Sequence, residues 1–295
     1  MRVARIIYDR LPVGTRTQIR SLVPRAIRRW YAHQKTDVYL ISYPKCGRTW
    51  LRLMLGRAIA RHFSLPESED ILFLHWKSRP HPKIPMITVV HDDRPMLKTA
   101  DELETSKAKY RNKKVIFLSR DPRDVIVSSF FEMKKRGRLF GENPYESRSP
   151  VFEGELREFI DREVGGFETI LRYYNIWADN RHIPRDFLLV RYEDLKNNPQ
   201  QGLRRILDFL GLEAVDDATV AEAVEFASFE NMRQMEAEGL FQSGMLKPAE
   251  KNDQDSYKTR KGRVGGFAEY LTEDEIERLN HRMQNLLSDF YGYRV

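Results

Sequence analysis

Cysteine is nearly missing from this sequence: its 295 residues include only Cys46. One thiol cannot form an intrachain disulfide, and it cannot build a zinc site from cysteines. The composition therefore excludes a small secreted domain held together by disulfides. It favours a reducing, cytoplasmic setting.

Long apolar runs are missing as well. No stretch approaches the roughly 18 consecutive apolar residues of a membrane-spanning helix. The first 34 residues lack the unbroken apolar segment of a secretory signal. There are no internal repeats or low-complexity tracts, and hydrophobic residues make up 41% of the chain. We therefore expect a soluble globular protein that neither spans a membrane nor is exported.

Acidic residues are scarce at the N-terminus, where the first 34 positions contain eight arginines and only Asp9. This segment alone accounts for the formal net charge of +7 and leaves 42 basic and 42 acidic side chains in the other 261 residues. We predict a basic N-terminal arm, residues 1–36, and one domain, residues 37–295. The apolar residues among the arginines leave several roles open for the arm: packing on the body, contact with an anionic membrane surface, or a transit peptide.

Short runs of β-forming residues alternate with helical patterns along the body. They predict strands at residues 38–42, 86–90, 115–119 and 187–191, and helices at residues 49–63, 121–136, 155–181, 199–210, 217–226 and 273–288. This alternation indicates an α/β fold of three layers, with a mostly parallel central sheet flanked by helices. Ligands of such folds bind beyond the carboxyl ends of the strands.

The loop after the first predicted strand has the composition of an anion site. The segment YPKCGRTW, residues 43–50, offers Gly47 for a tight turn, Lys45 and Arg48 for charge, and Thr49 for a hydroxyl at a helix start. It is not a Walker A loop, because the lysine precedes the only glycine by two positions. This spacing argues against an ordinary P-loop kinase, although a nucleotide-dependent kinase of related layout stays open.

A second candidate anion site follows the third predicted strand. In LSRDPRDVIVSS, Arg120 leaves the strand and Ser128 comes eight residues later in the next helix. An arginine fork and a hydroxyl placed in this way can converge on one phosphate. A third basic segment, RKGRVGGF at residues 260–267, lies in a polar region near the C-terminus.

The three segments, in this order, resemble motifs of the sulfotransferases of the cytosolic type. YPKCGRTW is similar to the family's 5′-phosphosulfate loop YPKSGTTW, with Cys46 and Arg48 as departures. Arg120 and Ser128 match its 3′-phosphate motif, and RKGRVGGF resembles RKGxxGDW. The resemblance covers about residues 38–272. It implies a P-loop-like nucleotide-binding fold and transfer of a sulfuryl group from 3′-phosphoadenosine 5′-phosphosulfate (PAPS).

The resemblance also implies which residues bind PAPS, the co-substrate. No metal is required, because lysine and arginine supply the cations. Trp50, Tyr192 and Phe229 are implied on the adenine side, where purines stack on aromatic rings; for Tyr192 and Phe229, ordinary core packing stays open. The implied donor-binding residues are Lys45, Cys46, Gly47, Arg48, Thr49, Trp50, Arg120, Ser128, Tyr192, Phe229, Arg260, Lys261 and Gly262.

Histidine is the natural base for this reaction near neutral pH. His91 ends the second predicted strand, where the family has its catalytic histidine, but the chain reads Val-Val-His where the family commonly has Lys-Thr-His. His75 and His81 stay open as alternatives.

Three catalytic roles follow from the resemblance. We expect His91 to take the proton of an acceptor hydroxyl, while Lys45 neutralises charge on the oxygen that bridges sulfate and phosphate. Ser128 is expected to help hold the 3′-phosphate and to restrain Lys45 until the acceptor binds.

The acceptor should carry a hydroxyl group, on a small molecule, a lipid or a glycan. Residues 64–85, 137–165 and 236–258 are expected to shape its pocket. No nucleic acid is expected as a partner, since the body is neutral, although a non-catalytic binder of anionic membrane or nucleic acid through the arm is an alternative of another class. The oligomeric state is open, a homodimer included. We expect a cytoplasmic protein, with peripheral membrane contact through residues 1–34 left open.

Overall fold

The computed structural model describes residues 24–66, 71–74, 81–137, 151–241 and 245–293. The chain divides into two units, Met1–Thr36 and Asp37–Val295. The described part of the first unit is the helix α3, Arg25–Lys35, which ends where the Thr36 hydroxyl donates to the Ala32 carbonyl at 2.9 Å. Separate roles for arm and body stay a prediction.

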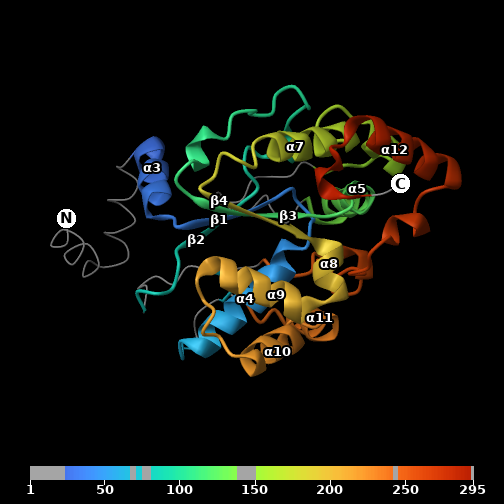
Figure 1. Cartoon of the computed structure of the whole chain (residues 1–295). Helices are drawn as coiled ribbons and strands as arrows, with labels where there is room; N and C mark the ends of the chain where they lie inside the picture. Colours follow the sequence, from blue (N-terminus) through green and yellow to red (C-terminus); the bar gives the residue numbers. More distant parts are fainter. Residues whose placement is uncertain (1–23, 67–70, 75–80, 138–150, 242–244, 294–295) are drawn as a thin grey trace. The chain divides into compact units, whose positions relative to one another are not determined.

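A four-stranded parallel sheet lies at the centre of the second unit (Figure 1). Its order is β2-β1-β3-β4, with β1 at Val38–Ser42, β2 at Ile87–Val90, β3 at Lys114–Ser119 and β4 at Asp186–Arg191. Every residue of β1 is buried, and so is every residue of β3 after Lys114. Such continuously apolar strands are typical of a sheet covered on both faces. The four predicted strands are confirmed to within a residue.

Helices cover both faces of this sheet (Figure 1). On one face α4, Arg48–His62, packs with α9, Pro199–Leu210, and α10, Asp217–Phe226. On the other lie α5, Pro122–Phe131, α7, Phe167–Asp179, and α12, Glu273–Leu286. The three-layer α/β prediction is confirmed.

The remaining helical elements of the described residues are short. They are α6, Leu156–Asp161, α8, Tyr192–Asn197, α11, Phe229–Glu238, a π-helix, Glu132–Arg136, and 3₁₀ turns at Ile71–Phe73, Pro95–Leu97, Ala108–Tyr110, Gln254–Ser256, Gly266–Glu269 and Asp289–Tyr291.

The prediction of one helix over residues 155–181 is wrong, because the helix is broken between α6 and α7. Arg162 leaves the helical conformation, and Gly165 has φ of +68°. The Gly165 N–H donates to the Lys98 carbonyl at 2.9 Å, so close to the Met96 backbone that a Cβ would clash. Close approach to a neighbouring loop, rather than helix propensity, decides the conformation here.

The chain order places the loops after β1 and β3 side by side. These two strands pair from Val38↔Lys114 to Ser42↔Leu118. The helix that follows β1 covers one face of the sheet, and the helix that follows β3 covers the other. This is the switch point of an open parallel sheet, where a crevice forms at the carboxyl ends of the strands.

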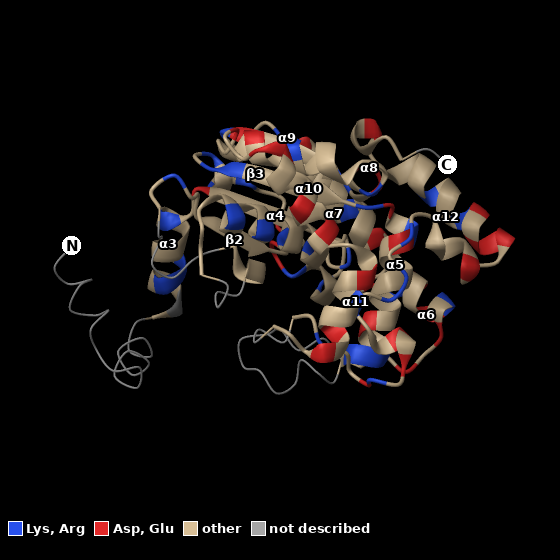
Figure 2. Ribbon diagram, turned by 90° about the horizontal axis from the view of Figure 1, so that it is seen from below, with Lys and Arg blue, Asp and Glu red and all other residues tan. Residues whose placement is uncertain are grey.

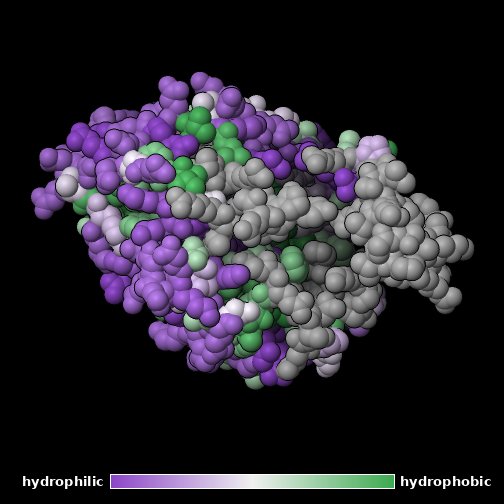
Figure 3. All heavy atoms as spheres, turned by 180° about the vertical axis from the view of Figure 1, so that it is seen from behind, coloured by the Kyte–Doolittle hydropathy of each residue, from purple (hydrophilic) through white to green (hydrophobic). Residues whose placement is uncertain are grey.

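The described surface has mixed character. Basic and acidic side chains are interspersed on the helices of the body (Figure 2). Seen from behind, the described surface is mostly hydrophilic, with scattered hydrophobic residues (Figure 3). Within the described ranges, no helix combines the length and apolar character needed to cross a bilayer.

Candidate functional site

The loop between β1 and α4 is built to receive an anion. Gly47 caps α4 with φ of +86°, and Lys45 also has a positive φ of 72°. No side chain caps the first N–H groups of α4, and its first turn has no acidic residue. The helix therefore presents free N–H donors and the positive end of its dipole at this loop.

The side chain of Cys46 in this loop faces inward. Its thiol is fully buried, 3.3 Å from the Tyr174 hydroxyl, and burial raises its pKa to about 12. A neutral, buried thiol cannot bind an anion in the loop. Only the backbone of Cys46 is available to contact it.

Arg120 connects three of the predicted motifs. Its guanidinium donates to the Lys45 carbonyl at 3.3 Å and to the Arg263 carbonyl at 2.8 Å. It also lies over the Tyr192 ring, 4.5 Å from the centroid, and pairs with Asp124 at 3.3 Å. The first loop, the C-terminal basic segment and one predicted adenine-side residue thus meet at one side chain.

The C-terminal basic segment is docked on the start of α5. The Asp124 carboxylate accepts the N–H groups of Gly265 and Phe267, both at 3.0 Å. Phe267 is buried under the Arg123 guanidinium, 4.4 Å from the ring centroid. The departure from the family's Trp at this position therefore keeps an aromatic anchor. Asp124 therefore anchors this segment.

Arg260, Lys261 and Gly262 extend from this docked segment. The Arg260 guanidinium lies 4.0 Å from the Phe131 centroid, and Lys261 pairs with Glu269. Gly262 has φ of +59°, and a Cβ there would come 2.8 Å from the Phe229 ring. The segment therefore needs glycine where it passes the aromatic residue.

The predicted adenine-side residues lie around the same loop. The rings of Trp50 and Tyr192 are 5.6 Å apart at 69°, in an edge-to-face arrangement. A Cβ on Gly47 would lie 2.5 Å from the Tyr192 ring. Phe229 starts α11 beside Gly262. The positions of Tyr192 and Phe229 are compatible with both predicted roles, packing in the core and contact with the adenine ring of the donor.

Sequence reasoning missed Glu132, which is the partner of Lys45. The two form a buried ion pair, and Glu132 also contacts Arg136 at 3.4 Å. Burial would raise the pKa of Glu132, but Lys45 and Arg136 outweigh it and lower the pKa to about 2. Burial, together with the positive charge of Arg136, lowers the pKa of Lys45 in spite of Glu132. Glu132 comes four residues after Ser128, so the two lie on the same face of a helix. That spacing was the sequence signal that could have placed Glu132 near Lys45.

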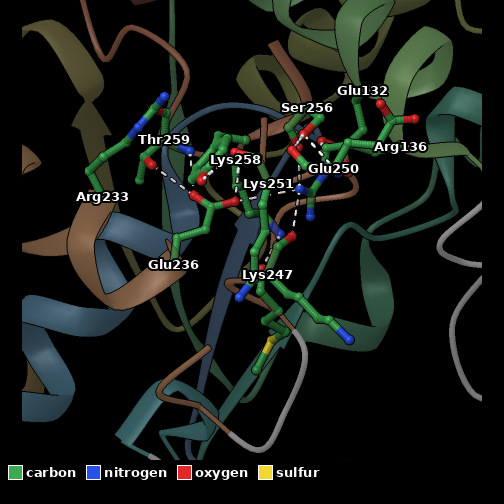
Figure 4. A network of polar contacts seen from close by, with 12 residues as sticks. Glu132, Arg136, Arg233, Glu236, Lys247, Glu250, Lys251, Ser256, Lys258 and Thr259 are labelled. Atoms are coloured by element: carbon green, nitrogen blue, oxygen red, sulfur yellow. Dashed lines mark hydrogen bonds and ion pairs between the residues drawn. The ribbon is translucent and has the colours of Figure 1, made fainter. Parts of the chain in front are cut away.

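A chain of buried charges continues from Glu132 (Figure 4). Arg136 contacts Glu236 at 3.5 Å, and the fully buried Glu236 carboxylate accepts the N–H groups of Lys258 at 2.6 Å and Thr259 at 2.9 Å. The Thr259 hydroxyl adds a bond of 2.7 Å to the same carboxylate. The network therefore holds the backbone immediately before Arg260.

His91 lies at the carboxyl end of β2, facing the first loop. Its Nδ1 is 3.0 Å from the Ser42 carbonyl, and its Nε2 is 2.7 Å from an Arg48 nitrogen. Burial, followed by the positive charges of Arg48, Lys258 and Arg52, holds its pKa well below the usual range. The imidazole is therefore neutral near pH 7, as a base must be.

The backbone after His91 is fixed by strained residues and buried bonds. Asp92, Asp93 and Arg94 all have φ between 45° and 64°. Asp92 pairs with the buried Lys107 at 2.8 Å, and the Tyr173 hydroxyl donates to the His91 carbonyl at 2.7 Å. Side chains that hold such a strained segment also fix the position of the imidazole.

Thr49 lies in the first turn of α4, and Ser128 lies in α5. His75 falls outside the described residues, while the His81 ring lies against the Phe63 ring, tilted by 32° with centroids 4.8 Å apart. The segments predicted to shape an acceptor pocket are described only in part. Across the described ranges, no group of three or more His, Cys, Asp or Glu side chains is placed to hold a metal ion.

Comparison with known proteins places this geometry in a family. The family model for the sulfotransferase domain matches residues 35–291. Flavonol 3-sulfotransferase of Flaveria bidentis is 26% identical over 264 residues, covering 83% of this chain and 79% of the relative. Cytosolic sulfotransferase 15 of Arabidopsis thaliana is 28% identical over 268 residues, covering 83% and 70%.

Solved structures share the fold. A mouse sulfotransferase complexed with PAP has a TM-score of 0.56 at 22% identity, covering 85% of this chain and 84% of that one. Retinol dehydratase in a complex with retinol and PAP has a TM-score of 0.54 at 19% identity, covering 86% and 82%. The match to the family model extends over most of the chain and includes every motif segment described above. The chain belongs to the sulfotransferase domain family.

Proposed function

We propose that this sulfotransferase moves a sulfuryl group from PAPS to an acceptor hydroxyl, with His91 as general base. The observation that carries the proposal is the meeting of the motif segments around Arg120 at the switch point of the sheet. The PAP bound in the structures of similar fold supports PAPS as the donor. PAP, 3′-phosphoadenosine 5′-phosphate, is the product that remains when the sulfuryl group has left PAPS.

The donor is expected to place its 5′-phosphosulfate at the start of α4. Free N–H groups, Lys45 and Arg48 are available there. Arg120, Ser128 and the segment from Arg260 to Gly262 are assigned to the 3′-phosphate. A purine would rest near the three aromatic residues predicted for it.

The chemistry assigned to the site is an in-line displacement at sulfur. The acceptor oxygen attacks sulfur while the bond between sulfur and the bridging oxygen breaks. His91 Nε2 takes the hydroxyl proton, and Lys45 neutralises charge on the departing phosphate oxygen. The products are a sulfate ester and PAP. This assigns no step to a metal.

The acceptor is proposed as a hydroxyl compound. One relative is named a flavonol 3-sulfotransferase, so flavonols are a reasonable first set for a screen. Lipids and glycans with free hydroxyls complete it. The single thiol and the relatives named cytosolic sulfotransferases support a cytoplasmic location.

The donor assignment is tested by thermal shift with PAP against ATP and magnesium. We expect PAP to raise the melting temperature and ATP to have little effect. The reverse result would support the kinase alternative, and no response to PAP would remove the central claim.

The catalytic roles are tested with labelled PAPS and a screened acceptor. Lys45→Ala and His91→Ala should each lower turnover by roughly 100-fold or more. His91→Ala should retain PAP binding, whereas Lys45→Ala should weaken it. His281→Gln, a change of an exposed histidine on α12, is the matched control and should leave turnover intact. Substantial activity in either alanine variant would overturn the corresponding role.

A further inference from the structure

The contact between Arg48 and His91 fixes the protonation of the imidazole. A backbone carbonyl only accepts, so Nδ1, 3.0 Å from the Ser42 carbonyl, carries the hydrogen. A guanidinium only donates, so Nε2, 2.7 Å from Arg48 Nη2, offers its lone pair. The one basic nitrogen of His91 is therefore already occupied by a hydrogen bond from Arg48.

The Arg48 guanidinium has little else to satisfy it. Its Nη1 is buried with no hydrogen-bond partner, and no carboxylate of the described residues pairs with it. Burial, followed by the charge of Arg52, lowers its pKa to about 9. By comparison, Arg120 has Asp124 and Arg136 has Glu132. A guanidinium with a buried, unpaired donor gains strongly from an anion placed beside it.

Arg48 lies at the position where an anion bound at the start of α4 would be located. It is the first residue of α4, next to Gly47, at the helix start that presents unsatisfied N–H groups. The contact with His91 spans 43 positions of the chain, so the side chain bridges the anion loop and the end of β2. A phosphate or sulfate group carries full negative charge and can accept two guanidinium N–H groups at once, whereas the neutral imidazole offers a single lone pair. An anion at the helix start therefore competes well with the neutral imidazole for this guanidinium.

We propose that Arg48 blocks the basic nitrogen of His91 in the donor-free enzyme and releases it when PAPS binds. The inference rests on the proposed role of His91. The 5′-phosphosulfate draws the guanidinium away, so that Nε2 becomes free to accept the acceptor's proton only when the sulfuryl group is in place. Arg48 is thus a switch that couples donor binding to base activation. The threonine typical of the family at this position has no guanidinium to do this.

The direct test is ¹⁵N NMR of labelled histidine, with His91 assigned by its loss in His91→Gln. In the wild-type protein, PAPS without acceptor should change the Nε2 signal and raise the pKa of His91. In Arg48→Thr, the donor-free signal should already resemble that of a free neutral imidazole, with a smaller change on PAPS binding. Arg57→Met, on the same helix but paired with Glu222 at 2.6 Å, should behave as wild type.

Charged groups other than Arg48 also act on His91. Arg52 of α4 and Lys258 of the C-terminal loop lower its pKa, and the Ser42 carbonyl raises it. Arg52→Met and Lys258→Met should shift the titration of His91 but leave the donor-free Nε2 hydrogen bond in place. This separates a switch through one hydrogen bond from a general electrostatic effect.

Donor binding, the NMR signal of His91 and activity together separate this inference from the proposed function. Arg48→Thr should weaken PAPS binding by roughly tenfold, as expected for one lost charge-assisted bond. An unchanged His91 signal in Arg48→Thr, or an Nε2 bond that persists with PAPS bound, would overturn the switch while leaving His91 as base. An active His91→Gln would overturn the base itself, and the switch with it.

Discussion

Lys258 lies in a polar loop, and nothing in the sequence around it predicts that its pKa is shifted. Its ammonium donates to the Met245 carbonyl at 3.0 Å, and the residue is partly buried. Burial, with the charges of Lys45, Arg136 and Arg48, lowers its pKa to about 7 in spite of Glu132. A lysine that titrates near neutrality beside the anion loop makes donor binding sensitive to pH.

The sign of this dependence follows from linkage. Above about pH 7 Lys258 of the free enzyme is neutral, whereas a bound anionic donor favours the protonated form and raises the pKa. Donor binding therefore takes up a proton above pH 7, and PAP affinity falls as pH rises, by at most about tenfold per pH unit. Calorimetry in buffers of different ionisation enthalpy measures the uptake directly.

Lys258→Met removes this titration and is the comparison for the wild type. Its PAP affinity should vary less above pH 7, because only the ligand's own ionisation and other groups remain. An identical slope in both proteins would show that Lys258 does not sense the donor.

Residues of the site differ in how far the sequence predicted them. Gly47, Arg120 and Gly262 lie within short motifs. The order of these motifs was enough to predict that the three residues belong to one site. The pairing of Lys45 with Glu132 spans 87 positions, and that of Arg48 with His91 spans 43. Neither pairing has a local pattern, because it depends on how β1, β2 and the helix after β3 pack in three dimensions.

Among the elements, the apolar patterns of the sequence predicted the strands and most of the longer helices. The strands and the helices α4, α9 and α10 lie close to their predicted bounds. The pattern missed α8 and α11, which are short and polar, and whose stability depends on tertiary contacts. It also joined α6 and α7, because the close approach at Gly165 is not visible in a periodicity.

Helix α11 acts as a positioning element through the side chain of Glu236. The carboxylate accepts from Lys258 and Thr259, and Arg136 donates to the Lys247 and Ser256 carbonyls, both at 2.7 Å. These bonds fix the loop that leads to Arg260. The element therefore sets the position of the cations assigned to the 3′-phosphate.

Glu236→Gln should disturb this arrangement, because an amide has one acceptor oxygen for donors that need two. We expect a loss of about 1–3 kcal/mol in the free energy of unfolding, typical of buried polar groups left unsatisfied. PAP affinity should fall by roughly tenfold while AMP, which lacks the 3′-phosphate, binds as before. Denaturant unfolding and titrations with both nucleotides measure the two effects.

Glu238→Gln is the matched control, since Glu238 is exposed on the same helix and accepts only from Gln234 at 2.9 Å. It should leave both affinities unchanged. Equal losses for PAP and AMP in Glu236→Gln would mean that Glu236 supports the whole site rather than the 3′-phosphate segment.

At the scale of the whole molecule, the chain separates two kinds of positive charge. The body is neutral, with basic and acidic residues mixed over its helices (Figure 2). Its site nevertheless gathers cations, several of them paired with the buried carboxylates of Asp124, Glu132 and Glu236. The excess of +7 lies in the first 34 residues, outside every motif of the site. Net charge is therefore a guide to the arm and not to the ligand of the domain.

The arm has the composition of a segment that binds an anionic membrane surface. In α3, Ile27, Trp30 and Tyr31 follow helical spacing and are 54%, 62% and 48% exposed, next to Arg28 and Arg29. Apolar and basic residues in one helix favour the interface of an anionic bilayer, with each arginine contributing about 1 kcal/mol. We expect the full chain to sediment with vesicles that contain phosphatidylserine, and far less with pure phosphatidylcholine.

The two contributions to this binding can be separated in the full-length protein. Changing Arg28 and Arg29 to Glu should abolish the preference for anionic vesicles, and raised salt should weaken wild-type binding, because salt screens the attraction between charges at the surface. Trp30→Ser should weaken binding at every salt concentration, since it removes the apolar contact. Stabilisation by PAP should be the same in all variants. Vesicle binding that survives both changes and the deletion of residues 1–34 would assign the membrane contact to the body instead of the arm.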